Sequence, residues 1–174
     1  MAGEHRQAQA RRVVTGVNDE GKSCFVGDEL TPHRFVGPGN TKCDLWRVAG
    51  IPVSCTDGDG IDQVRTEPPK GGLVVRQTTF APDSDWDKSL GYSDAAGQLA
   101  GTIAPEDADG VPGFHFTESV DVVTVLNGEL VAIMETGEKV LRAGDTIVMR
   151  GTNHAWENRT DEPVTVQSIM ISAG

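Results

Sequence analysis

Short segments rich in β-branched and other apolar residues recur along this chain between turn signals, and no other feature limits its fold as strongly. Long helical periodicity is missing, so the segments are expected to be strands. Many short strands at this spacing are typical of an antiparallel sandwich or a closed barrel, and they predict an all-β fold. The expected strands are residues 11–17, 23–27, 42–50, 72–82, 115–128, 129–137, 138–145, 146–151, 154–160 and 164–173.

Turn residues separate the strands of the C-terminal half. Asn127 and Gly128 stand between two apolar segments, and this pair is a strong signal for a hairpin. Further turns are expected at residues 135–139 and 142–145, where glycine follows threonine or alanine. We therefore predict a tight antiparallel meander from His115 onward.

Composition limits the class of protein. The chain has 174 residues, of which 37% are hydrophobic, and this suffices for one domain with its own core. No apolar run approaches the roughly 20 residues that a membrane helix needs. The net charge of -11 repels phosphate backbones and anionic membranes, so neither nucleic acid nor a membrane is an expected partner.

The ends and the cysteines support the same interpretation. Residues 1–12 lack the apolar region of a secretory signal and are expected to form a flexible N-terminus before a single domain at 13–174. The spacing of Cys24, Cys43 and Cys55 matches no zinc or redox motif, and an odd number argues against a disulfide framework. Reduced thiols in the cytoplasm are the expectation.

Residues 82–113 differ from the rest because they are polar, rich in glycine and aspartate, and poor in β-branched residues. A loop of this length within a compact domain is typical of a lid, a binding loop or a partly disordered segment. A short helix is expected at residues 93–101, capped by Ser93 or Asp94.

The strand that begins at His115 carries the candidate site. Because side chains alternate along a strand, one face holds first polar and then apolar residues. This face consists of His115, Thr117, Ser119, Asp121, Val123 and Val125. The order fits a barrel with a polar mouth and a packed deep end, and it makes Asp121, not Glu118, the carboxylate that can join His115.

A second candidate segment follows the turn at Gly144 and Asp145. His154 opens a strand on which Trp156 and Asn158 share its parity. A histidine followed two positions later by tryptophan suggests a polar group with an aromatic wall beside it.

Residues 113–158 resemble the two sequence motifs of the cupin superfamily. The first motif, H-x-H with a glutamate and a glycine beyond it, is matched by His115, Thr117, Asp121 and Gly128. The second motif is matched by Gly144, Met149, Gly151, His154 and Asn158, with methionine in place of proline and one residue fewer after the first glycine. Strictly, the resemblance covers about a quarter of the chain, but the combined spacing is fairly specific.

The resemblance implies a small single-domain cupin with an RmlC-like antiparallel jelly-roll barrel. It also implies an internal site, usually a divalent metal held by three histidines and a glutamate. Thr117 and Asp121 replace the second histidine and the glutamate, so the possible ligands are His115, Asp121 and His154. Two imidazoles and one carboxylate suit iron or manganese, and nickel or zinc are also compatible.

Two readings of this site stay open. In one, the metal serves a decarboxylase, isomerase, lyase or dioxygenase that acts on a small carboxylate, carbonyl or aromatic metabolite. His115, Asp121 and His154 would then be catalytic, and Thr117, Ser119 and Trp156 would contact the substrate. In the other, the polar residues form a hydrogen-bonded network without metal, which serves acid–base catalysis, plain ligand binding or structure alone.

Two further expectations concern charge and assembly. Arg76 and Arg150 could bind a carboxylate substrate with both nitrogens, although a surface ion pair is the commoner role. Small cupins commonly dimerise through N-terminal strands, so the resemblance implies a homodimer.

Overall fold

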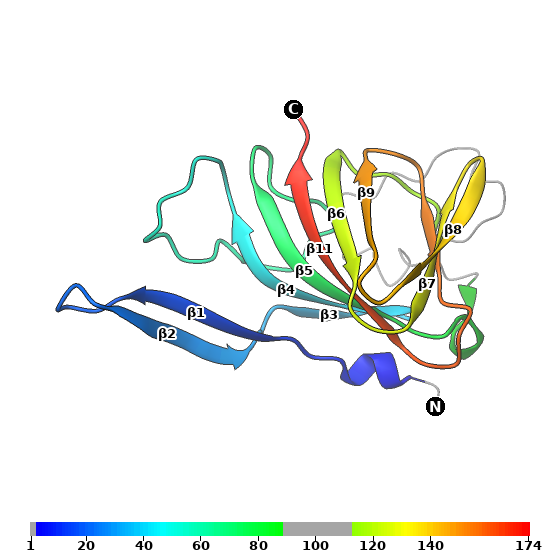
Figure 1. The fold of residues 1–174 in the computed structure, drawn as a ribbon, viewed down its shortest axis with the longest axis horizontal. Coiled ribbons are helices and arrows are strands. Elements are labelled where there is room, and N and C mark those ends of the chain that lie inside the picture. Colours follow the sequence, from blue (N-terminus) through cyan, green and yellow to red (C-terminus); the bar gives the residue numbers. More distant parts are fainter. Residues whose placement is uncertain (1–2, 89–112) are drawn as a thin grey trace.

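Two antiparallel sheets face each other in the computed structural model of the protein, which describes residues 3–88 and 113–174. The larger sheet has the order β3-β4-β5-β11-β6-β9, the smaller one has the order β10-β7-β8, and β1 pairs only with β2 (Figure 1). The strands are β1 Arg11–Val17, β2 Ser23–Leu30, β3 Arg34–Val36, β4 Asn40–Val48, β5 Leu73–Phe80, β6 Ser119–Val125, β7 Glu129–Met134, β8 Gly137–Arg142, β9 Thr146–Arg150, β10 Ala155–Glu157 and β11 Val164–Ser172. Two 3₁₀ turns, η1 Glu4–Gln7 and η2 Asp83–Asp85, complete the described elements.

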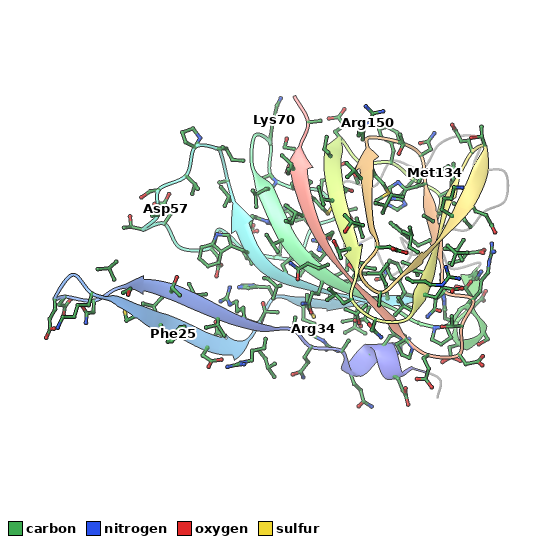
Figure 2. The ribbon with its side chains drawn as sticks, in the orientation of Figure 1. Phe25, Arg34, Asp57, Lys70, Met134 and Arg150 are labelled. Atoms are coloured by element: carbon green, nitrogen blue, oxygen red, sulfur yellow. The ribbon has the colours of Figure 1, made fainter. Side chains whose placement is uncertain are left out.

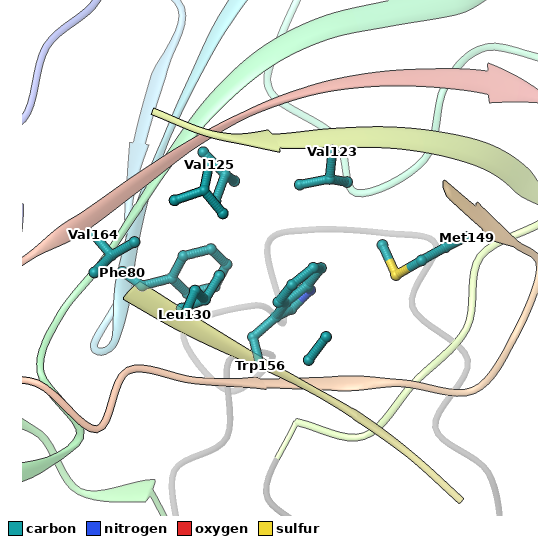
Figure 3. Close-up of a cluster of buried hydrophobic side chains, with 9 residues drawn as sticks. Phe80, Val123, Val125, Leu130, Met149, Trp156 and Val164 are labelled. Atoms are coloured by element: carbon teal, nitrogen blue, oxygen red, sulfur yellow. The ribbon is translucent and has the colours of Figure 1, made fainter. Parts of the chain in front are cut away.

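The core lies between the two sheets. Residues of β6 alternate between buried and half-buried from Ser119 to Val125, which confirms the predicted parity of this strand. Figure 3 shows Phe80 and Trp156 between the sheets, with the valines of β6 on one side. The cluster comprises Phe80, Val123, Val125, Leu130, Ala132, Met149, Trp156, Val164 and Val166. This arrangement is the expected jelly-roll barrel.

The predicted meander is wrong except at the turn between β7 and β8, because no other consecutive pair among the described strands β6 to β11 is hydrogen-bonded. β6 pairs with β11 and β9, whereas β7 pairs with β8 and β10, so the chain crosses between sheets at Asn127. The Asn127 amide donates to the Pro163 carbonyl at 3.1 Å, and its oxygen accepts from the Thr165 N–H at 2.8 Å. Asn127 therefore anchors the crossing to the start of β11 instead of closing a hairpin.

The N-terminal residues are more ordered than their composition predicts. His5 is only 2% exposed, and one of its ring nitrogens lies 3.3 Å from the Gly37 carbonyl. Arg34, on the unpredicted strand β3, donates to the Ala8 carbonyl at 2.8 Å. These contacts hold residues 3–10 against the large sheet, and β1 already begins at Arg11.

The β1–β2 hairpin projects from the barrel (Figure 1). Its register shifts between Val14 and Thr15, and several of its large apolar side chains are exposed. Figure 2 shows Phe25 on this hairpin, away from the barrel side chains, and 77% of Phe25 is accessible. Most of the predicted loop at 82–113 and the whole predicted helix at 93–101 lie outside the described residues. No described helix is long and apolar enough to cross a membrane.

Candidate functional site

A cavity of about 90 Å³ lies between the two sheets. A water molecule needs at least roughly 10–15 Å³ of such a volume, so the cavity has room for a small metabolite of a few heavy atoms. Its lining residues are Asn40, Lys42, Thr66, Arg76, Thr78, Phe80, His115, Thr117, Asp121, Val123, Met149, His154, Trp156, Val166, Ser168 and Met170. The predicted site residues His115, Thr117, Asp121, His154 and Trp156 therefore meet in one place.

The two histidines are held as a pair by their own backbones. The N–H of each donates to the carbonyl of the other at 2.9 Å, so His115 and His154 form an isolated bridge beside β6 and β10. Their ring centroids are 4.6 Å apart with an interplanar angle of 48°. A contact that the sequence predicted from motif spacing alone is thus fixed by main-chain hydrogen bonds.

The hydrogen bonds of the rings assign their tautomers. Nδ1 of His115 lies 2.7 Å from the Gly113 carbonyl, and Nδ1 of His154 lies 2.8 Å from the Thr152 carbonyl. A carbonyl only accepts, so each Nδ1 carries the hydrogen and each Nε2 keeps its lone pair. Within residues 3–88 and 113–174, neither Nε2 has a hydrogen-bond partner. The cavity therefore contains two adjacent proton acceptors.

Burial keeps both rings neutral. The pKa of His115 falls to about 4, mainly because the ring loses water and also because His154 lies beside it. Burial also lowers the pKa of His154, while the hydrogen bond to Thr152 and the charge of Asp121 act in the opposite direction. Of the two rings, His154 is therefore the one whose protonated form is stabilised by a nearby negative charge, that of Asp121.

A chain of hydroxyl groups orients Asp121. The hydroxyls of Thr117 and Ser119 are 2.8 Å apart, and Ser119 donates to the Asp121 carboxylate at 2.6 Å. Burial raises the pKa of Asp121, and the Ser119 hydrogen bond partly offsets that effect. Ser119 is 1% exposed and is not among the lining residues of the cavity, so here it orients Asp121, and its contact with a substrate stays a prediction.

The sequence did not decide whether Trp156 belongs to the core or to the cavity wall, and in the structure it does both. Its ring belongs to the core, with the Phe80 centroid 6.1 Å away, and it also lines the cavity. The His154 ring meets it edge-on at 5.9 Å and 78°. Trp156 is therefore the aromatic wall that holds His154 in place.

Arg76 is neither a surface ion pair nor a free carboxylate binder. It is 3% exposed and contacts Asp44, which is fully buried, through Nε at 2.5 Å and Nη2 at 3.2 Å. Its guanidinium also reaches the carbonyls of Arg65 and Thr66. Arg150 is exposed on β9 and does not line the cavity.

Sequence reasoning missed the contribution of β4. Asn40, Lys42 and Asp44 alternate along this strand, and the first two line the cavity. The available signal was a polar residue at every second position of a strand flanked by apolar residues. That pattern was ambiguous, because the same alternation describes an ordinary solvent-facing strand.

The described residues do not fit a resident metal ion. Within residues 3–88 and 113–174, no three His, Cys, Asp or Glu side chains are grouped closely enough to hold one. His115 and His154 supply two imidazoles, but Asp121 is engaged with Ser119 and does not complete a three-ligand set with them.

Comparison with known proteins identifies the barrel. Residues 101–171 match the family model described as "Cupin domain". This part of the barrel is similar to a cupin domain. The matched segment contains both histidines of the cavity, Asp121 and the sheet crossing at Asn127.

Similar proteins include several fungal ones. Phomopsin biosynthesis cluster protein C' of Diaporthe leptostromiformis is 49% identical over 47 residues, which are 26% of this chain and 25% of that protein. A cupin-domain-containing oxidoreductase of Neurospora crassa, srdD, is 28% identical over 93% of this chain and 73% of its own length. The solved RmlC-like cupin of Shewanella frigidimarina is 16% identical over 82% of this chain and 85% of that one, with a TM-score of 0.44. The match thus spans only a quarter of the phomopsin protein.

Proposed function

We propose that this protein is a cupin enzyme that moves a proton next to a carbonyl group of a small metabolite, without a resident metal. The observation that carries the proposal is the pair of neutral imidazoles, His115 and His154, in a cavity that the Asp121 carboxylate also lines. Related proteins named cupin-domain-containing oxidoreductases support an enzyme of small-molecule metabolism in the broader sense.

The roles of the side chains follow from their charges. His154 accepts the proton at Nε2, because the Asp121 carboxylate stabilises the imidazolium that forms. His115 remains neutral, since a second positive charge 4.6 Å away is unfavourable, and the protonated His154 itself returns the proton to the substrate. Thr117 faces the same cavity and can hydrogen-bond the substrate oxygen, while Trp156 covers the apolar part of the substrate.

Such a proton transfer is common to several of the predicted reactions. Isomerases and lyases remove a proton from a carbon beside a carbonyl, and decarboxylases add one to an enolate. Burial favours this chemistry, because a base without a hydration shell needs no desolvation at the moment of reaction. We therefore take proton exchange, not a complete turnover, as the first activity to measure.

The test is deuterium exchange into small 2-oxo acids, beginning with 2-oxobutyrate in D₂O, followed by proton NMR. We expect wild-type protein to exchange the C3 hydrogens well above the buffer rate. His154→Gln should lose about 10²-fold or more of the rate, in line with general-base catalysis. If 2-oxo acids bind in the cavity without any exchange, the protein is a non-catalytic binding module and the proposal fails.

We also propose that the protein is a homodimer. The hairpin β1–β2 exposes Val17, Phe25 and Val26 at 69%, 77% and 61%, and within the described residues its two strands pair only with each other. On the outer face of the large sheet, Val148 and Ile169 are also exposed. A second copy of the chain that covers these two surfaces would remove the apolar area from water.

A further inference from the structure

Lys42 is a charged residue of the cavity that the acid–base mechanism does not use. It lies on β4 opposite Thr78 of β5, and it lines the cavity together with Asn40. The residue is only half-buried, so its ammonium group can reach a ligand. Within residues 3–88 and 113–174, no side chain forms an ion pair with it.

The nearby carboxylate is already engaged. Asp44 accepts from Arg76 at Oδ1 (2.5 Å) and at Oδ2 (3.2 Å), and Arg47 approaches the same Oδ2 at 3.6 Å. Arg47 also contacts Asp62 at 3.0 Å, outside the cavity. Two cations, Arg76 and Arg47, thus share one buried carboxylate, and Lys42 on the same strand as Asp44 forms no ion pair with it.

Lys42 is a half-buried basic residue in a chain whose net charge is -11. Loss of water is the main reason that its pKa falls to about 7; the positive charge of Arg76 acts in the same direction, and Asp44 acts against it. An ammonium in this position is costly without a ligand, and a bound anion would offset that cost.

We propose that Lys42 binds the carboxylate group of a small organic acid whose carbon frame lies against Trp156 and Met149. The inference rests on the proposed function, because it names the substrate class of the same cavity. A carboxylate fits better than a larger anion because the cavity is small, and Trp156 and Met149 offer an apolar surface for a short carbon chain. His115 and His154 then lie at the end of the ligand that carries the reacting carbon.

Binding can be measured without turnover. Protein labelled with ¹³C at its methionine methyl groups is titrated with butyrate, and with butyramide as a neutral analogue of the same shape. Met149 and Met170 line the cavity, whereas Met134 does not, so the shifts report where the ligand binds. We expect saturable shifts of Met149 and Met170 with butyrate and weak or no response to butyramide.

The variant Lys42→Met should bind butyrate about ten- to a hundred-fold more weakly, as expected for the loss of a charge-assisted hydrogen bond. Lys42→Arg keeps a cation and should restore part of the affinity. Lys22→Met is the matched control, because Lys22 is 74% exposed at the tip of the hairpin and should leave binding unchanged. Lys42→Met should also unfold at the same or a higher temperature, because the cost of burying the cation is gone.

The pH dependence gives a second readout. The charged and titratable groups around Lys42 are Asp44 on β4, Arg76 on β5, His115 before β6, Asp121 on β6 and His154 before β10. Bound carboxylate raises the lysine pKa, so affinity is full below about pH 7 and falls as pH rises. Lys42→Met should lose this fall, which separates the lysine from the other groups.

Three results would overturn the inference. Butyrate and butyramide could shift the same methyl groups with equal affinity, Lys42→Met could bind butyrate as well as wild type, or inorganic phosphate could bind more tightly than butyrate. Failure of the acid–base mechanism looks different, because butyrate would still bind while deuterium exchange is absent. His154→Gln should retain butyrate binding and lose only exchange.

Discussion

At the scale of single residues, the environment of each group in the cavity determines its chemistry. His115 and His154 have the same side chain and similar backbone contacts, but only His154 has the Asp121 charge to support protonation. Asp121 itself depends on Ser119, a residue that does not reach the cavity. Substituting a residue outside the cavity can therefore alter the base inside it.

The histidine pair should make the folded state sensitive to acid. The pKa of His115 is about 4 in the folded protein and 6.5 when unfolded, so the unfolded state binds more protons between these values. The contribution of His115 to the free energy of unfolding is then complete above about pH 6.5. It decreases by about 3 kcal/mol as the pH falls to 4. Urea unfolding across this range should show the decrease, and His115→Gln should reduce its slope.

That measurement needs a correction for Asp121 and a control variant. The raised pKa of Asp121 acts in the opposite direction, so only the difference between wild type and His115→Gln reports the histidine. His33→Gln lies outside the cavity and serves as the control. An unchanged slope in His115→Gln would mean that this ring is not desolvated in solution.

The donor set predicts that the protein works without a bound divalent ion. The described part of the chain offers two imidazoles without a third grouped ligand, and two ligands hold a metal weakly. Dialysis against a chelator should leave deuterium exchange and butyrate binding unchanged. Near-stoichiometric metal in wild-type protein that disappears in His154→Ala, measured by elemental mass spectrometry, would contradict this expectation.

At the scale of elements, the sheet crossing after β6 allows the cavity to exist. If β6 and β7 formed the hairpin that the sequence suggests, both would lie in one sheet, and His154 of the opposite sheet would not face Asp121. Asn127 prevents this by bonding to both sides of the start of β11. Gly128 allows the close approach, since a Cβ atom there would lie 2.8 Å from a methyl group of Val164.

Two glycine substitutions test the crossing. Gly128 and Gly144 both have positive φ angles, 72° and 93°, but a Cβ at Gly144 would meet nothing within 4 Å. Each change to alanine should cost about 1 kcal/mol for backbone strain, and Gly128→Ala should cost about 1–3 kcal/mol more for overpacking. Denaturant unfolding measures both values, and equal losses would show that Val164 moves aside freely.

At the scale of the whole molecule, the distribution of exposed apolar surface indicates where a second chain could bind. The barrel buries its aromatic residues between the sheets, whereas the hairpin β1–β2 leaves Val17, Phe25 and Val26 in solvent (Figures 1 and 2). A two-stranded ribbon on its own is marginally stable in water. Contact with a second chain would supply the burial that this hairpin lacks.

Light scattering tests the dimer directly. We expect a mass near twice the 18.5 kDa of one chain, and we expect Phe25→Asp to shift the protein toward the monomer because a buried charge is costly. Lys22→Met, at the same hairpin, is the control that should leave the mass unchanged. A mass of one chain for the wild type over a wide concentration range would rule out the homodimer.

The sequence by itself determined the all-β class, most of the strand positions and the face of β6 that points inward. These features depend on local alternation, which any strand with one buried face must show, and the spacing of His115 and His154 indicated the cupin domain as well. Tertiary structure alone decided which strands pair, because pairing depends on contacts between residues far apart in the chain, such as Asn127 with Pro163 and Thr165. It also decided that Arg76 is neutralised by Asp44 while Lys42 is not, since a charge acquires its role only from the groups that the fold brings beside it.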